Sequence, residues 1–352
     1  AQLNNAAKFK SGKRNDYLPY FGISAEVWQK STALSVDNIF GSDAIKLCPP
    51  TGTPGVRKSL APLAHFINCH GGSVDTQFYG QHGETFPVSM DSDDVTKGAK
   101  RDTVVAAECC YGAQLFDPAM TDGTLPIANA YLGAGAAGYF GSTTIAYGPS
   151  AGNGAADLLT QYFLINMLAG ASLGRACLQA RQKFVQTQKM ADPVNLKTLG
   201  QFILLADPSI QPCLVEGPDV KSLAKVVDFS DARKRRRIAL TAFGHAAADS
   251  SGFPGKKVVR LSDALHKLVR KVARQRGFRA TKKFSAFHVV GGDNYSKAMK
   301  ASGTESKVMM LTEQAARRSK TDKNPESVKP THILVAHAHD GHIIDIAEYF
   351  SR

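Results

Sequence analysis

Short apolar runs that stop at glycine or polar residues recur along the first 214 residues. Residues 64–69, 103–107 and 138–144 form three such runs, and residues 201–205 form a fourth. Apolar runs of this length, bounded by turn residues, are typical of strands buried on both faces of a parallel sheet. By contrast, residues 1–60 are polar and rich in turn residues, which predicts a long loop and reveals no opening strands.

Helical patterns separate these strands. Residues 156–168 carry apolar side chains at helical spacing, and Ser172 is placed to cap a second helix that runs to about residue 188. A shorter helical segment follows Pro126, which we expect at the first helical position. Strands that alternate with helices predict a three-layer α/β sandwich with a mostly parallel sheet, whose ligand sites lie at the carboxyl ends of strands.

Charge divides the chain into two parts. Residues 1–214 hold 16 Lys and Arg against 16 Asp and Glu, whereas residues 215–352 hold 27 against 14, so the whole net charge of +13 lies in the second part. We therefore expect an α/β domain over residues 1–214 and a smaller, basic α+β domain over residues 215–352. The second contains a cationic run at 233–237 and a capped amphipathic helix at 262–276. No apolar run is long enough to span a membrane.

The six cysteines favour a reducing compartment. They are sparse for a disulfide-stapled domain, two of them are adjacent, and no Cys-x-x-Cys pair suggests a zinc knuckle. We expect a cytoplasmic, bacterial protein. Because the chain begins at Ala1 without an initiator methionine, a leader segment can be missing, and secretion stays the alternative.

His70 and Cys109 each follow a predicted strand, at the edge where ligands bind. A thiol becomes a good nucleophile when a neighbouring base removes its proton, and a histidine can later return that proton to a leaving amine. The backbone N–H groups of Gly71 and Cys109 are candidates for an oxyanion hole, and glycine allows the backbone to approach a substrate closely. These residues predict a Cys-His dyad.

Three segments resemble caspase-fold cysteine peptidases. Residues 68–72 (NCHGG) resemble their His-Gly turn, and residues 107–112 (AECCYG) resemble the Cys-x-x-Gly nucleophile turn of metacaspases, legumains, separases and gingipains. Residues 201–209 (QFILLADPS) are similar to the LLGDPS segment that closes the gingipain catalytic domain. The resemblance covers about residues 60–212. It implies a caspase-like, closest to gingipain-like, endopeptidase that cleaves proteins or peptides through an acyl-enzyme and needs no metal or organic cofactor.

The choice of nucleophile, base and pocket stays open. Cys109 fits Cys-x-x-Gly, whereas Cys110 fits the Cys-x-Gly of the caspases proper; the gingipain-like ending favours Cys109. His82, in a second His-Gly pair, is the rival base. By resemblance the strand after the catalytic one lines the pocket for the residue before the cleaved bond, and two acidic residues are candidates to bind a basic side chain there. These substrate-binding candidates are Gly141, Ser142, Thr143 and Thr144, with Asp75 and Glu84.

Other features of the sequence suggest functions different from that of the Cys-His dyad. Residues 133–138 match GxGxxG, but they follow a helical segment and open a strand, the reverse of a dinucleotide fingerprint. His337, His339, Asp340 and His342 resemble the HxHxDH metal motif of metallo-β-lactamases with its aspartate one place early, so metal-dependent hydrolysis is a third hypothesis. The second is a non-catalytic caspase-like scaffold whose basic domain binds an acidic protein or a nucleic acid.

Overall fold

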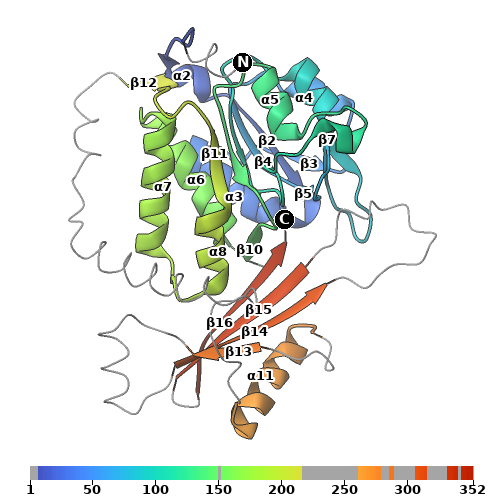
Figure 1. The fold of residues 1–352 in the computed structure, drawn as a ribbon, viewed down its shortest axis with the longest axis vertical. Helices are drawn as coiled ribbons and strands as arrows, with labels where there is room; N and C mark the ends of the chain where they lie inside the picture. Colours follow the sequence, from blue (N-terminus) through green and yellow to red (C-terminus); the bar gives the residue numbers. More distant parts are fainter. Residues whose placement is uncertain are drawn as a thin grey trace.

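The computed structural model describes residues 7–149, 152–215, 261–278, 285–288, 306–314, 331–339 and 342–351. A six-stranded sheet forms its centre, with helices on both faces (Figure 1). The strands lie in the order β3-β2-β4-β8-β9-β11. Their bounds are Tyr20–Ala25 (β2), Lys46–Cys48 (β3), Ala64–Asn68 (β4), Val104–Ala107 (β8), Gly138–Ser142 (β9) and Phe202–Ala206 (β11).

Five of the six strands run parallel to one another. β2 pairs in parallel with β3 and β4, β4 with β8, and β8 with β9, while β11 pairs antiparallel with β9. The prediction of an α/β fold with a mostly parallel sheet is confirmed. Because β4 and β8 are parallel neighbours, with Ile67 opposite Ala107, their carboxyl ends lie at the same edge of the sheet.

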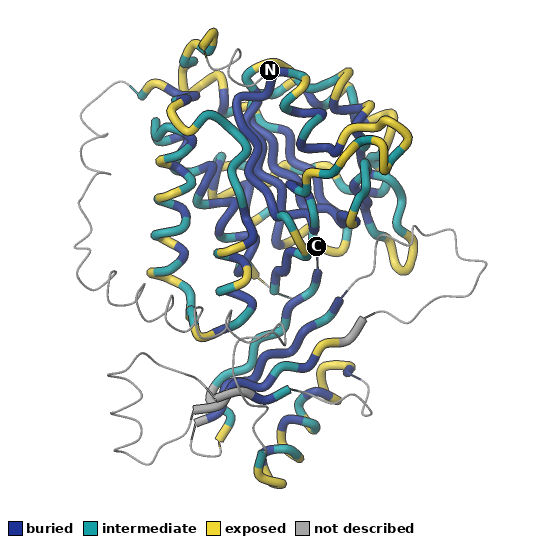
Figure 2. Tube along the Cα trace, in the orientation of Figure 1, coloured by how far each residue is buried: buried dark blue, intermediate teal, exposed yellow. Residues whose placement is uncertain are grey.

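The alternation of side chains along β8 builds two separate cores. Val104 and Ala106 face one core, and Val105 and Ala107 face the other. The first core is covered by α3, α6 and α7, and the second by α4 and α5, so the unit has three layers. The buried strands run through its middle (Figure 2). The bounds are Gln29–Phe40 (α3), Ser92–Gly98 (α4), Ile127–Gly133 (α5), Ala156–Leu168 (α6) and Leu173–Thr187 (α7).

The predicted helices form, and the fold contains further helices that the sequence analysis did not predict. α6 has the expected bounds, and the Ser172 side chain accepts a hydrogen bond from the Arg175 N–H at the start of α7. Pro126 is the N-cap of α5 and not its first helical residue. The sequence pattern did not predict α8 (Pro193–Gln201). Within the described segments, no helix combines the length and the apolar character that crossing a bilayer requires.

The expectation of a long opening loop over residues 1–60 is wrong. β2, α3 and β3 lie there, and β2 is buried between β3 and β4. The error has a physical cause: the inner face of α3 includes hydroxyl side chains whose buried hydrogen-bond partners lie on other elements, β2 and α6. Thr32 exchanges a hydrogen bond with Ser24 (2.8 Å), and Ser31 donates to Asp157 (2.7 Å). Because these hydroxyl groups are hydrogen-bonded, burying them has no large energetic cost. A serine or threonine at a buried position, however, interrupts the hydrophobic pattern from which a helix is predicted.

Two smaller sheets flank the centre. The first, β5-β6-β7, begins directly after β4 and lies at the edge where β4 ends. The second consists of β1, near the start of the chain, and β12, which ends at residue 214; the two strands pair in parallel. A short helix, α2 (Arg14–Tyr17), follows β1. The strand bounds are His70–Gly71 (β5), Gln77–Tyr79 (β6), Val88–Asp91 (β7), Gly12–Lys13 (β1) and Cys213–Leu214 (β12).

The later residues add an antiparallel sheet in the order β10-β16-β15-β14-β13 (Figure 1). Its edge strand β10 comes from the first part of the chain and pairs with the last strand, β16. The amphipathic helix α11 (Asp263–Gln275) packs on this sheet, and Ser262 caps it as predicted. The division at residue 214 stays a prediction. The strand bounds are Tyr147–Pro149 (β10), Ser285–His288 (β13), Ser306–Gln314 (β14), Thr331–His339 (β15) and His342–Ser351 (β16).

Candidate active site

His70 lies in the turn that leaves the central sheet. β4 ends at Asn68, and after Cys69 the chain enters β5, which pairs with β6 so that His70 lies opposite Tyr79. The His70 side chain is buried, and its ring packs against Trp28, with ring centroids 4.3 Å apart. The small sheet therefore holds the imidazole at the carboxyl edge of the central strands.

The two adjacent cysteines lie in the turn that follows β8. The next residue, Tyr111, has φ of 56°, a left-handed conformation that costs a non-glycine residue of order 1 kcal/mol. Backbone hydrogen bonds tie this turn to the end of β9: Tyr111 N–H donates to the Thr144 carbonyl (2.9 Å), and Ala113 N–H donates to the Ser142 carbonyl (2.8 Å). Strained backbone held by its surroundings is common at functional sites.

The histidine turn and the cysteine turn touch through their backbones. A Cβ atom added to Gly71 would lie 1.9 Å from the carbonyl oxygen of Cys110 and 3.5 Å from Cβ of Cys109. Only glycine fits at this distance. Segments 40 residues apart in sequence, carrying His70 and the two cysteines, therefore meet at one edge of the sheet.

The two thiols have different surroundings. Cys109 belongs to the core beneath α4 and α5, and its Sγ lies 3.9 Å from the Ile67 carbonyl oxygen. Burial, reinforced by the nearby thiol of Cys69, raises the pKa of Cys109 well above its usual value. Cys110 Sγ lies 3.5 Å from the carbonyl oxygen of Ala146, just before β10. Both thiols are buried, so a substrate reaches either of them only after the groups that cover it move.

The predicted pocket segment is split between core and surface. Gly141 and Ser142 are buried in the sheet, whereas Thr144 is exposed and Thr143 is half-buried. Thr143 also bonds to the Gln201 carbonyl through its N–H and its hydroxyl (both 3.1 Å). The carbonyls of Ser142 and Thr144 both accept a hydrogen bond from the cysteine turn, and of these two residues Thr144 is the exposed one.

Lys197, on α8, joins this segment to the next strand and was missed by the sequence analysis. Its ammonium donates to Thr144 Oγ1 (2.8 Å), to the Ile145 carbonyl (2.6 Å) and to the side chain of Gln201, and lies 5.3 Å from the centroid of the Tyr147 ring. Lys197 is exposed as a residue, while its ammonium is engaged by these groups. Burial lowers the pKa of Lys197, and a charge on Cys110 acts in the opposite direction. The Lys197 ammonium and Cys110 Sγ thus contact adjacent carbonyls, those of Ile145 and Ala146.

The acidic candidates and the rival base lie on or beside the β5-β6-β7 sheet. Asp75 accepts hydrogen bonds from the Tyr79 hydroxyl (3.0 Å) and the Gln77 N–H (3.1 Å), and Glu84 is exposed at the tip of a turn. His82 is exposed, and its Nδ1 lies 2.5 Å from Glu26 Oε2. These bonds engage Asp75 locally and pair His82 with a carboxylate.

The remaining sequence motifs occupy other parts of the fold. Residues 133–138 join the end of α5 to β9, the helix-then-strand order read from the sequence. His337 Nε2 lies 4.0 Å from Asp192, while Asp340 and the cationic run at 233–237 lie outside the described residues. Among the described residues no group of three or more His, Cys, Asp or Glu side chains could hold a metal ion, and no disulfide joins any of the six cysteines.

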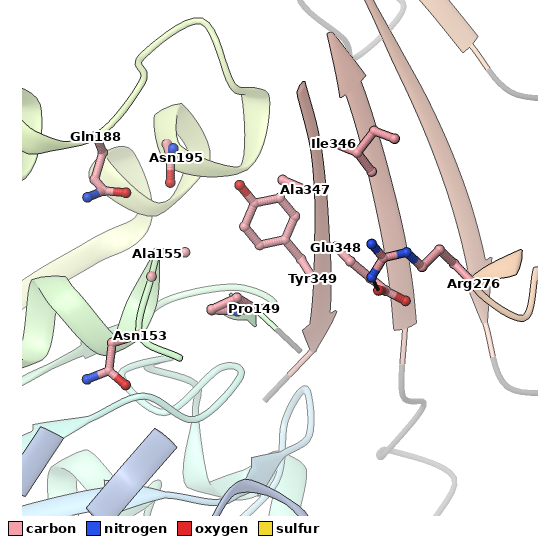
Figure 3. A pocket seen from close by; sticks show the side chains of 11 residues that line it. Pro149, Asn153, Ala155, Gln188, Asn195, Arg276, Ile346, Ala347, Glu348 and Tyr349 are labelled. Atoms are coloured by element: carbon pink, nitrogen blue, oxygen red, sulfur yellow. Dashed lines mark hydrogen bonds and ion pairs between the residues drawn. The ribbon is translucent and has the colours of Figure 1, made fainter. Parts of the chain in front are cut away.

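A cavity of about 270 Å³ lies between the start of α6, α8 and β16, away from the two turns. The ring of Tyr349 and the carboxamide of Asn195 face it from β16 and α8 (Figure 3). The Tyr349 hydroxyl donates to Asp192 (2.6 Å), the N-cap residue of α8. This contact, with the pairing of β10 and β16, joins the C-terminal sheet to the elements that carry Thr144 and Lys197.

Comparison with known proteins gives little further guidance. No family model and no curated protein matches the sequence. A solved structure titled "Structure of Protease" is similar over 60% of this chain and 52% of its own, with 11% sequence identity and a TM-score of 0.38. The chain thus spans about half the length of that protein, and a likeness this weak assigns neither family nor activity.

Proposed function

We propose that this protein is a cysteine endopeptidase of the caspase-like kind, with His70 as the base. The observation that carries the proposal is the backbone contact of Gly71 with Cys110, because it brings the turn after β4 against the turn after β8. A three-layer α/β sandwich with both turns at the carboxyl edge of its sheet supports it. The alternative from the sequence, a non-catalytic scaffold, is supported by the burial of both thiols.

We further propose Cys110 as the nucleophile, in place of the Cys109 that the sequence motif favours. Cys109 packs in an apolar core, where a thiolate has no compensating charge. Cys110 Sγ and the Lys197 ammonium contact the adjacent carbonyls of Ala146 and Ile145, and a nearby cation stabilises a thiolate.

The chemistry follows from these positions. His70 takes the thiol proton, and Sγ attacks the peptide carbonyl to form a tetrahedral intermediate. The backbone N–H of Gly71 and that of the nucleophilic cysteine, Cys109 in the sequence prediction and Cys110 here, stabilise the oxyanion. The C–N bond then breaks while the imidazolium protonates the leaving amine, and water hydrolyses the thioester to release the acid and the thiol.

Substrate recognition is proposed at the exposed end of β9. Thr143 and Thr144 can line a pocket beside the cysteines, while Gly141 and Ser142 support it from the core. Asp75 and Glu84 stay the candidates for binding a basic side chain, and Glu84 is exposed at its turn. The proposed substrates are proteins or peptides.

Labelling with a peptidyl chloromethyl ketone or epoxide tests this function. Mass spectrometry of the labelled protein should place one adduct on Cys110, and Cys110→Ala should abolish both labelling and peptide cleavage. The matched variant Cys109→Ala should keep both. Loss of labelling in Cys109→Ala alone would restore the nucleophile expected from the sequence. No adduct at either thiol, under conditions that label a control thiol peptidase, would favour the scaffold.

A further inference from the structure

The imidazole of His70 is held by a side chain that the proposed chemistry leaves unused. His70 Nε2 lies 2.7 Å from Oε1 of Gln81, which extends from the turn between β6 and β7. The ring also packs between Trp28 and Phe86, with centroid distances of 4.3 and 5.0 Å. The contact with Gln81 is polar and directional, whereas the two aromatic contacts restrict the plane of the ring.

The orientation of the Gln81 carboxamide follows from its other bond. Gln81 Nε2 lies 3.0 Å from the carbonyl oxygen of Gly83, and a carbonyl oxygen can only accept a hydrogen bond. The NH2 group therefore faces Gly83 and the oxygen faces His70. The main chain is anchored as well, because Gln81 N–H donates to the Cys48 carbonyl (3.1 Å). The amide cannot flip without losing a bond.

An amide oxygen that faces an imidazole nitrogen requires a proton on that nitrogen. In neutral histidine one ring nitrogen is a donor and the other an acceptor, so a proton on Nε2 makes Nδ1 the basic nitrogen. We propose that Gln81 is a positioning residue that holds His70 in the Nε2–H tautomer, so that Nδ1 exchanges the proton with the nucleophilic thiol. This inference rests on the proposed function for its catalytic consequence, but the tautomer itself is a property of the resting protein.

A neutral acceptor has a different effect from a carboxylate at the same place. An aspartate or glutamate beside the imidazole would stabilise its charged form and raise its pKa, whereas an amide orients the ring with less effect on its charge. Other ionisable groups lie on the elements around the ring. They include Glu26 and His82, which pair with each other, Glu84, Asp75 and Tyr79 of the small sheet, and the thiols of Cys48, Cys69, Cys109 and Cys110.

The tautomer can be measured directly. In protein labelled with ¹⁵N-histidine, the His70 ring signals are assigned by their loss in His70→Gln. Their shifts should report a proton on Nε2 at a pH where the ring is neutral. A proton on Nδ1 would overturn the proposal. The measurement needs no peptidase activity, so it is independent of the failure or success of the thiol labelling.

The fluorescence of Trp28 supplies a second measurement, because Trp28 is the single tryptophan of the chain and packs on the His70 ring. Its fluorescence should change as His70 gains a proton. In Gln81→Glu the midpoint of that change should move up by about one pH unit or more, since an opposite charge now faces Nε2. Gln77→Glu is the matched control: Gln77 lies in β6 of the same small sheet and its oxygen accepts from Tyr79. An unmoved midpoint in Gln81→Glu would refute the contact.

Activity completes the test where peptide cleavage is detected. Gln81→Leu should lower kcat at least about tenfold with little change in KM, because the ring loses its preferred tautomer while the substrate pocket stays intact. Gln77→Leu should keep the wild-type kcat, and thermal melting should show that both variants fold. A Gln81→Leu protein with full kcat would contradict the positioning role.

Discussion

Substituting Gly71 by alanine perturbs the contact on which the proposed active site depends. The added Cβ would lie 1.9 Å from Cys110 O and 3.1 Å from its carbonyl carbon. An ordinary carbon–oxygen contact is about 3.3 Å, so one of the two turns must move by roughly 1.4 Å. Both sides of the contact are backbone, which cannot rotate away as a long side chain can.

This displacement should affect stability and activity to different degrees. Overpacking of this kind typically costs about 1–3 kcal/mol of unfolding free energy. A shift of about 1 Å between catalytic groups can cost about 100-fold in rate. We therefore expect Gly71→Ala to fold with that loss of stability, measured by urea denaturation, and to lose at least about 100-fold in kcat/KM on a cleaved peptide.

A glycine in open space provides the control. In Gly133→Ala, at the end of α5, the added Cβ meets no atom within 4 Å, so the variant should match the wild type in both assays. The reasoning would be refuted if Gly71→Ala also retained the wild-type unfolding free energy and kcat/KM, because the two turns could then not be in the contact described.

Two further predictions concern buried polar groups. His65 is fully buried, and burial lowers its pKa to about 4 from an unfolded value of 6.5. The unfolded chain therefore binds the proton first, so the contribution of His65 to stability is complete above pH 6.5, and about 3 kcal/mol of unfolding free energy is lost as the pH falls to 4. In urea titrations, His65→Gln should show a shallower fall of unfolding free energy with falling pH. Equal pH dependence in the variant and the wild type would contradict this. Asp192 accepts hydrogen bonds from Val194 N–H (2.8 Å) and from the Tyr349 hydroxyl. Asp192→Ala should therefore lower the unfolding free energy by about 2–3 kcal/mol and speed proteolysis near β16, and Asp192→Asn should lower it less. Equal losses of unfolding free energy in the two variants would argue against these hydrogen bonds.

Much of the central architecture was readable from local pattern. The strands that became β4, β8, β9 and β11 are short apolar runs closed by turn residues, α6 is a longer apolar segment, and α7 and α11 carry apolar side chains at helical spacing. These patterns are properties of adjacent residues, so they can be recognised without knowledge of the fold. β2 was missed because Gly22 and Ser24 interrupt its apolar run. α3 was missed because its buried face includes Ser31 and Thr32, whose hydrogen-bond partners lie on other elements.

The candidate site was only half predictable. His70 and the cysteine pair could be placed at strand ends because turn residues follow buried runs in the sequence. The sequence motif favoured Cys109 over Cys110, but a motif does not fix which of two adjacent side chains faces the apolar core, where Cys109 lies. Gln81 and Lys197 carry no local signal, because each gains its significance from a partner that folding brings beside it.

The sequence by itself determined that this chain builds an α/β sandwich and which residue types stand at the ends of its strands, because hydrophobic period and turn chemistry are local. Only the tertiary structure decided that Gly71 touches Cys110, that Gln81 faces His70, and that β10 joins the C-terminal strand β16. Such contacts depend on strand order and register, which are set by the packing of the whole core and are written in no single segment.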